Sequence, residues 1–322
     1  MIEVYCSGNL VADVQTKTLT QFLPVDQVAI VDEIELILGG NAANAAICLA
    51  RMGVQAGVIG RIGDDFFGQF VRNVLAEAGV DTQMLMAQTG AKTAATVAAI
   101  DEQGRRRCAH TPGVTSQFTA QDFDWRAIAS NGRHTPNGQS PFLHFSSFFL
   151  LPGFDGPAAA QVLQRARAAG LRTSLDVCWD PSGQWAAALL PILPHCDIIF
   201  PNQAEARAIT QRDAPVDMAD WFLANGVQTA VIKLGPDGCL VKQQGGQPVR
   251  INGYAAPVVD ATGAGDAFAG GFLAAQVWGW DVEACARFAC ALAALSVTDF
   301  GAARAIQSKE QVLNFMKSGS RE

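Results

Sequence analysis

The chain has 322 residues, of which 49% are hydrophobic and 16% charged, so it can bury the core of one large α/β domain or of two domains. Its 23 basic and 30 acidic residues give a net charge of −7. That balance argues against a general role on nucleic acids or on membrane surfaces, and we expect neither as a partner.

Strands and helices are predicted to alternate along most of the chain. Hydrophobic periodicity and turn signals predict strands at 2–6, 28–38, 56–59, 93–100, 106–110, 142–145, 173–177, 196–200, 230–233 and 239–242, and helices at 44–52, 64–78, 158–169 and 267–278. Such alternation is typical of a mostly parallel sheet covered by helices on both faces, with its binding sites at the carboxyl ends of the strands.

Two β-rich stretches, at about 14–38 and 92–113, have no helix between their strands. They are predicted to form a small sheet apart from the main one. The residues Asp101–Gly104 have the composition of a hairpin turn within the second stretch.

The eight cysteines are scattered and include no Cys-x-x-Cys pair or Cys/His cluster, so a zinc site is not expected. Free thiols are typical of a reducing compartment, and the start of the chain lacks the pattern of a signal peptide. The apolar run Ala267–Trp280 is too short to span a bilayer and is interrupted by Gln276. We expect a cytoplasmic protein.

The segment Asp260–Asp266 follows a β-like run at 255–259 and leads into an apolar helix. Small residues before a helix let backbone N–H groups surround an anion, and the helix dipole adds positive potential there. Gly263, Ala264 and Gly265 would supply these donors, and Asp266 would accept a proton from a hydroxyl that attacks the anion. A Gly-rich turn with an acidic residue near a helix start is the plainer alternative.

A second Gly/Asn segment, Gly39–Ala46, follows the alternating run that ends at Leu38. Glycines admit close backbone approach to a ligand, and Asn side chains carry both donors and acceptors, which suits a polyol. The alternative is a helix start capped by Asn41.

With these two segments the chain resembles the ribokinase-like (PfkB-type) carbohydrate kinases. Asp260–Asp266 matches the family's C-terminal signature Asp-x-Thr-Gly-Ala-Gly-Asp, and Gly39–Ala46 is similar to its N-terminal signature. The resemblance runs from Gly8 to Gly301. It implies one α/β domain over 1–322, with the small sheet acting as a lid over the sugar site and making a homodimer contact.

The same resemblance implies the acceptor site. Asp13 matches the position whose carboxylate grips sugar hydroxyls, although an Asp in a turn also bonds its own backbone. Gly39, Gly40, Asn41 and Asn44 would complete that site.

On the nucleotide side, Asn202 and Glu205 match the family's Asn-x-x-Glu motif, which organises Mg²⁺ through water and the phosphates of ATP. The same spacing is also a helix capping-box pattern. Lys233, Gly235 and Gly238 match a strand-to-turn element under the phosphates, where many members have Thr in place of Lys233.

Asp260 and Thr262, with backbone carbonyls at 297–301, resemble the family's site for a monovalent cation, so K⁺ is a possible activator. One departure concerns the segment Asp176–Asp180. Many members read Asp-x-Asn-x-Arg there, whereas this chain has Cys178 and Asp180 in place of the polar pair. That difference argues against a phosphosugar acceptor.

We therefore expect an ATP- and Mg²⁺-dependent kinase of ribokinase, fructokinase or 2-keto-3-deoxygluconate kinase type. A sugar acid would need a cation, for which Gly104–Arg107 is a candidate, although solvated arginines are the plainer interpretation. The alternatives are a nucleoside kinase, with Phe22 or Phe118 as a base platform, and a non-catalytic sugar-binding regulator.

Overall fold

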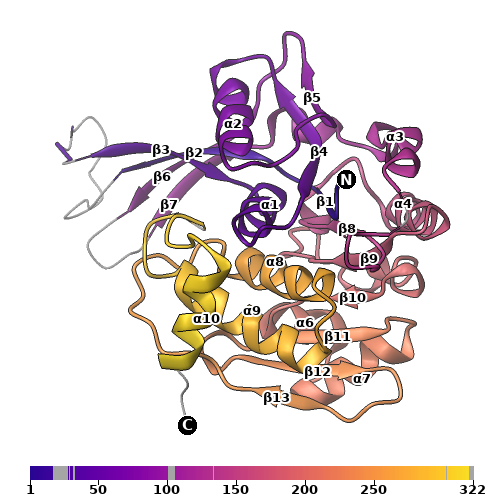
Figure 1. Cartoon of the computed structure of the whole chain (residues 1–322). Coiled ribbons are helices and arrows are strands. Elements are labelled where there is room, and N and C mark those ends of the chain that lie inside the picture. The colour runs from indigo at the N-terminus through magenta and orange to yellow at the C-terminus, as the bar shows by residue number, and fades with distance from the viewer. Residues whose placement is uncertain are drawn as a thin grey trace.

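The computed structural model describes residues 1–318 apart from 17–27, 29, 32, 101–105, 133 and 302. Its main sheet has nine strands in the order β13-β12-β11-β10-β9-β8-β1-β4-β5 (Figure 1). These strands are β1 (Val4–Ser7), β4 (Ala56–Gly63), β5 (Leu85–Gln88), β8 (Phe142–Phe145), β9 (Arg172–Leu175), β10 (Ile198–Ile199), β11 (Thr229–Lys233), β12 (Cys239–Gln243) and β13 (Val249–Ile251). Only the β11–β12 and β12–β13 pairs are antiparallel, so the predicted mostly parallel sheet is confirmed.

Helices cover both faces of this sheet, each over its own apolar core. One face is covered by α1 (Asn41–Arg51), α2 (Phe66–Glu77), α8 (Ala264–Val277), α9 (Val282–Ser296) and α10 (Lys309–Ser318). The other is covered by α3 (Trp125–Ser130), α4 (Gly156–Ala168), α5 (Ala186–Leu189), α6 (Gln203–Thr210) and α7 (Pro215–Ala224). No helix among the described residues is long and apolar enough to cross a bilayer.

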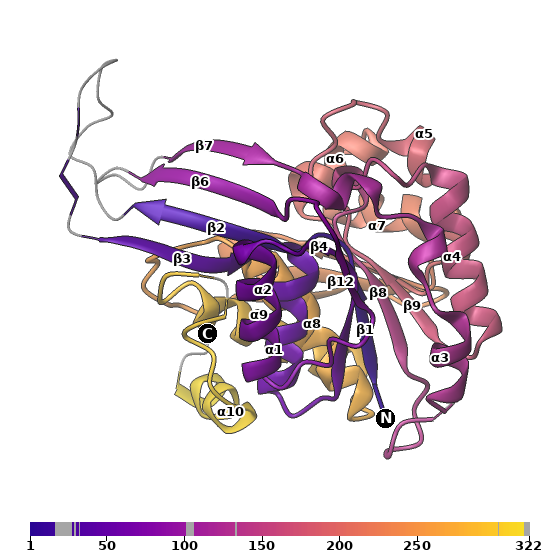
Figure 2. The same ribbon diagram turned by 90° about the horizontal axis from the view of Figure 1, so that it is seen from above.

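A second, four-stranded sheet extends away from the main body (Figure 2). It consists of β2 (Val11–Thr16), β3 (Ile34–Gly39), β6 (Ala94–Ile100) and β7 (Arg106–Thr111), in the order β3-β2-β6-β7, and we call it the lid. The predicted separate sheet is therefore present. The proposed hairpin turn at 101–104 lies outside the described residues.

Two predicted strands differ from the structure. The run at 28–38 becomes a strand only from Ile34, because β2 supplies a partner only up to the Thr16–Ile34 pair, while Val28 and Ile30 are more than nine-tenths exposed. The β-like run at 255–259 is an irregular segment without a partner strand, and Pro257, within it, has no N–H for a ladder.

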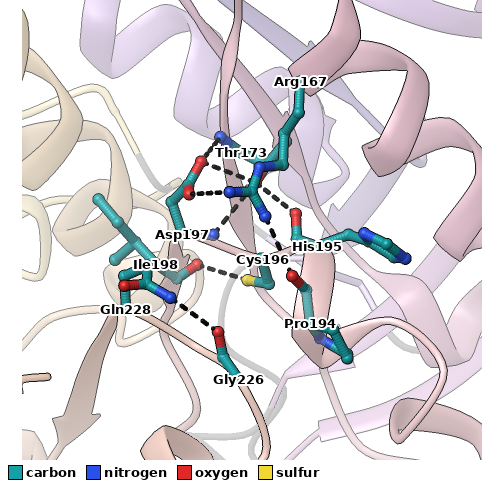
Figure 3. Close-up of polar contacts among 9 residues, drawn as sticks. All are labelled: Arg167, Thr173, Pro194, His195, Cys196, Asp197, Ile198, Gly226 and Gln228. Carbon is teal, nitrogen blue, oxygen red and sulfur yellow. Dashed lines mark hydrogen bonds and ion pairs between the residues drawn. The ribbon is translucent and has the colours of Figure 1, made fainter.

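Side chains tie strands β9 and β10 together at the end of the sheet opposite their carboxyl ends (Figure 3). The Asp197 carboxylate accepts hydrogen bonds from the Thr173 backbone N–H at 2.7 Å and from its hydroxyl at 3.0 Å. The Thr173 hydroxyl also lies 2.6 Å from the carbonyl oxygen of His195, and Arg167 donates to the carbonyl of Pro194 at 3.0 Å. These contacts fix the strand register, which positions the functional side chains at the other end.

Candidate active site

Helix α8 begins within the C-terminal signature. Gly263 caps it in the left-handed conformation, with φ of 73°, which a residue without Cβ adopts at little cost. Asp266 then lies in the first turn, and its side chain is buried. The predicted helix began at 267, but the signature itself forms the first turn and so aims this carboxylate into the molecule.

Two amides from the N-terminal signature hold the buried carboxylate. Helix α1 begins at Asn41, three residues earlier than predicted, which places Asn41 and Asn44 on one face of its first turn. Asn41 Nδ2 donates to Asp266 Oδ1 at 2.7 Å, and Asn44 Nδ2 donates to Asp266 Oδ2 at 2.8 Å. The helix is capped by Gly40 without a side-chain bond, so the alternative of an Asn41 cap is wrong.

Burial raises the pKa of Asp266 to about 7, with a further contribution from the negative charge of Asp176. The hydrogen bonds from Asn44 and Asn41 act in the opposite direction, as does the positive charge of Lys233. A carboxyl with this pKa can exchange a proton near neutral pH.

Ser147, which the sequence did not single out, supports this arrangement from the segment just after strand β8. Its buried hydroxyl lies 2.7 Å from Oδ1 of Asn41 and 2.6 Å from Oδ1 of Asn9, and its backbone has a φ of 61°. With Oδ1 of Asn41 facing this donor, Nδ2 must face Asp266. A serine in the left-handed region is uncommon and marks local strain, but its sequence carries no signal for that conformation.

A cavity of about 440 Å³ opens between the lid and the start of α1. Its polar lining comes from Asn9, Asp13, Asn41, Thr96, His110 and Thr115, and its apolar lining includes Phe149, Pro152 and Pro181. Asp13 lies in the middle of β2, so the alternative of an Asp in a turn is wrong, and it pairs across the sheet with Thr96. Thr96 in turn pairs with His110, 3.1 Å away through Nδ1, so these three side chains share one face of the lid.

Gly39 packs directly against the Asp13 carboxylate. A Cβ at residue 39 would lie only 2.1 Å from Asp13 Oδ2, so any side chain there must displace the carboxylate. Gly40 is equally restricted, because a Cβ there would approach the Asn9 carbonyl oxygen to 2.5 Å. The two glycines thus allow α1, Asp13 and Asn9 to meet at one point.

We expect Gly39→Ala to raise the KM for the acceptor about 10- to 100-fold, since displaced charge-assisted hydrogen bonds are worth ~1.5–3 kcal/mol. The dissociation constant for ATP should change little. Steady-state kinetics would check both constants, with Gly246→Ala in an exposed turn as the control. An unchanged KM for the acceptor would show that Asp13 does not contribute to acceptor binding.

Two further cavities lie on the other side of the Gly263–Gly265 turn. The first, of about 430 Å³, has mainly apolar walls that include Tyr254, Val258 and Phe268, and also Ala264 and Gly265. The second, of about 370 Å³, lies at the amino end of α6. Asn202, Lys233 and Gly235 line both cavities, and Gly238 lines the first. An apolar compartment beside a polar one suits a nucleotide base and its phosphates.

The capping box predicted at Asn202 and Glu205 is confirmed. Asn202 Oδ1 accepts from the Glu205 N–H at 2.9 Å, and the Glu205 carboxylate accepts from the Asn202 N–H at 2.8 Å. Burial raises the pKa of Glu205 above its ordinary value, against the opposing charge of Lys233. One oxygen of Glu205 is thus used by the helix start, and the second is the one that could face a ligand.

Asp260 is buried and holds the loop before α8. Its Oδ1 accepts from the backbone N–H and the hydroxyl of Thr262, at 2.9 and 2.7 Å, and its Oδ2 accepts from the Gly301 N–H at 3.2 Å. The backbone N–H groups of Val259 and Asp260 both donate to the carbonyl of Val297. The residues predicted for a monovalent-cation site are therefore brought together.

Residues 1–309 match the model of the pfkB family of carbohydrate kinases. The chain belongs to this family. It is 27% identical to a ribokinase of Haemophilus influenzae over 288 residues, 88% of each chain, and 25% identical to a fructokinase of Vibrio alginolyticus over 327 residues, 98% of this chain and 99% of that one. Among solved structures, Arabidopsis thaliana ribokinase complexed with ribose and ATP superposes with a TM-score of 0.83 and 24% identity, over 98% of this chain and 99% of that one.

The ribokinase-like fold predicted for this pfkB carbohydrate kinase is thereby confirmed, with its main sheet and its lid. The predicted acceptor residues Asp13, Gly40 and Asn41 line the cavity beside the lid, and the predicted nucleotide residues Asn202, Lys233, Gly235 and Gly238 line the other two. Gly39, Asn44 and Glu205 line none of these three cavities. Gly39 packs against Asp13, the amide of Asn44 faces Asp266, and Glu205 caps α6.

Proposed function

We propose that this kinase transfers the γ-phosphate of ATP to a hydroxyl of a small sugar or sugar acid, as ribokinases, fructokinases and 2-keto-3-deoxygluconate kinases do, with Asp266 as the general base. The observation that carries the proposal is the place of Asp266 between the cavities. Asn41, which lines the acceptor cavity, donates to its carboxylate, and Gly265, which precedes it, lines the nucleotide cavity.

In this mechanism Asp13 and the Gly40–Asn41 backbone hold the acceptor. Asp266 takes the proton of the attacking hydroxyl as the phosphoryl group moves in line toward it. The N–H groups of Gly263, Ala264 and Gly265, at the positive end of α8, stabilise the charge that develops on that group. Closure of the lid excludes water and so suppresses hydrolysis of ATP.

Mg²⁺ would neutralise phosphate charge when it is bound with ATP. The described residues include no cluster of three or more His, Cys, Asp or Glu side chains, which fits an ion held mainly by phosphates and water. Glu205 would hold it through water. We also propose K⁺ beside Asp260 and Thr262, where the Asp260 carboxylate is already satisfied by N–H and hydroxyl donors, so that backbone carbonyls would supply most ligands.

A coupled ADP-release screen tests the proposal, with ATP, Mg²⁺ and either K⁺ or Na⁺. The panel contains ribose, fructose, tagatose, 2-keto-3-deoxygluconate, adenosine, inosine and phosphosugars. We expect a hit among the unphosphorylated sugars that is lost in Asp266→Asn. Failure to bind ATP would refute the kinase proposal and favour a sugar-binding regulator.

One of the two aromatic residues proposed to stack on the base of a nucleoside acceptor is buried in the core. Phe118 is fully buried, and its ring centroid lies 5.7 Å from that of Phe123 and 5.2 Å from that of Phe154. It therefore cannot stack on a base. Phe22 lies outside the described residues, as do Gly104 and Arg105 of the segment considered for a sugar acid.

We further propose a homodimer formed through the lid. Ile34, Leu36 and Val97 leave 64%, 39% and 54% of their surface exposed on this small sheet. Neighbouring apolar side chains of this kind mark an association surface. Ile34→Glu combined with Val97→Glu should halve the molar mass measured by light scattering, and a wild-type monomer would contradict the dimer.

We also propose that the protein works in the cytoplasm. All eight cysteines are free thiols, and even the Sγ atoms of Cys239 and Cys290, which lie 3.8 Å apart, are not joined. Reduced, mostly buried thiols suit that compartment.

A further inference from the structure

A largely buried ion pair lies beside the two nucleotide cavities. Lys233 Nζ, at the end of β11, lies 2.7 Å from Asp176 Oδ2, just after β9, and both side chains are at least 88% buried. A Cβ at Gly265 would lie 3.1 Å from the same Nζ, so the ammonium touches the turn that precedes Asp266. Lys233 also lines both nucleotide cavities.

We propose that Asp176 is a positioning residue that holds the Lys233 ammonium beside the glycine turn, and that the pair sets the affinity for the phosphates of ATP and the electrostatic environment of the turn that carries Asp266. The inference rests on the proposed function and adds to it. Asp176 begins the segment in which Cys178 and Asp180 depart from the family pattern, and no phosphate role was expected for that segment.

The geometry leaves Lys233 few other positions. An isolated ammonium that is this buried costs several kcal/mol unless a carboxylate accompanies it. Asp176 provides that partner from the neighbouring part of the sheet, and Glu205 adds a second negative charge close by. The ammonium is therefore fixed before ATP arrives, which is the preorganised charge that phosphoryl transfer requires.

The charges around Asp266 determine whether each substitution raises or lowers its pKa. Asp176 raises the pKa of Asp266 and Lys233 lowers it, so the two members of the pair act in opposite directions. The other titratable groups near the pair or near Asp266 are Glu205, Cys6, Cys48, Cys178 and His144. Burial raises the pKa of the three thiols and lowers that of His144 to about 4, so at neutral pH these four are uncharged.

Three variants separate this role from a merely structural one. Asp176→Asn should lower the pKa of Asp266, and Lys233→Met should raise it by a smaller amount, because the charge of Asp176 has the larger effect. The double variant should give a pKa between those of the two single variants, because both opposing charges are gone. It also removes both members of the ion pair, so neither is left buried without its partner, and it provides a folded protein even where Lys233→Met alone does not.

The primary measurement is the titration of the Asp266 carboxyl by ¹³C NMR, assigned through its loss in Asp266→Asn. It needs no acceptor and no turnover. Calorimetry with MgATP is the second readout, in which Lys233→Met and the double variant should both bind about tenfold or more weakly. Lys242→Met, which breaks an ion pair with Asp220 outside these cavities, is the matched control and should change neither quantity.

The inference would be supported if the two single variants shift the pKa of Asp266 in opposite directions and the double variant lies between them. This holds even where no acceptor on the panel is phosphorylated. Shifts in the same direction, or none, would overturn it, as would unchanged MgATP affinity in Lys233→Met. The kinase proposal is tested separately, because its failure is a failure to transfer phosphate or to bind ATP at all.

Discussion

Asp266→Asn should lower the turnover number by at least ~10², while the dissociation constant for ATP stays within a few-fold of wild type. The substitution keeps the shape of the side chain and its place on α8, but it removes the group that accepts the proton of the attacking hydroxyl. One of the two amide donors, from Asn41 or Asn44, keeps an oxygen acceptor at this position, and the other amide must turn so that its Oδ1 accepts from the new NH₂ group. The loss should therefore fall on the chemical step and not on the assembly of the site.

Single-turnover kinetics with MgATP and an acceptor would measure this loss directly. Asp281→Asn is the matched control, because Asp281 caps α9 through the Ala284 N–H at 2.8 Å and Asn serves equally well at that position. A variant at residue 266 with near-normal turnover would show that the acceptor loses its proton elsewhere.

The same substitution should stabilise the protein at alkaline pH. The pKa of Asp266 is raised from 3.8 to about 7 in the folded chain, so the folded state binds a proton that the unfolded state releases between these values. The stabilising contribution of the protonated group is complete below pH 3.8 and is lost as the pH rises toward 7. Ionised Asp266 thus destabilises the fold under working conditions.

Relative to wild type, the free energy of unfolding of Asp266→Asn should rise by roughly 2–3 kcal/mol between pH 5 and pH 8.5. Urea unfolding at both pH values would measure the change. The turnover number of the wild type should fall as the pH drops below about 7, because the Asp266 carboxyl is then protonated and cannot accept a proton. A pH-independent stability difference would show that the folded carboxyl keeps its ordinary pKa.

A candidate site could be predicted from the sequence because its two signatures are local patterns with a chemical meaning. The Gly263–Gly265 turn, the capping box at Asn202 and the glycines before α1 could all be read from spacing. The partners of Asp266 could not, because Asn41 and Asp266 are 225 residues apart and meet only through the packing of α1 against α8. Helix periodicity also placed the start of α1 at residue 44, three residues late, and so did not show that Asn41 and Asn44 share the first turn that faces Asp266.

Ser147 and Asp176 show a second limit. Ser147 lies in no motif, and Asp176 begins the segment that departs from the family pattern; each contacts a candidate site residue, Ser147 the side chain of Asn41 and Asp176 that of Lys233. Their roles depend on which strands of the sheet are neighbours, and that order is fixed by the whole fold. The prediction of a β-like run at 255–259 was wrong for a related reason, because β-propensity alone does not supply a partner strand.

The junction between β3 and α1 has a mechanical consequence. The lid strand β3 ends at Gly39 and α1 begins at Asn41, so a single residue, Gly40, joins this lid strand to the helix that carries Asn41 and Asn44. A Cβ at Gly40 would lie 2.5 Å from the Asn9 carbonyl oxygen and 2.8 Å from the Cα of Leu10, so the joint is closely packed. In the proposed mechanism, a movement of β3 would reach Asn41 through one residue, and the fit of the molecule under the lid would then affect how Asn41 holds the Asp266 carboxylate.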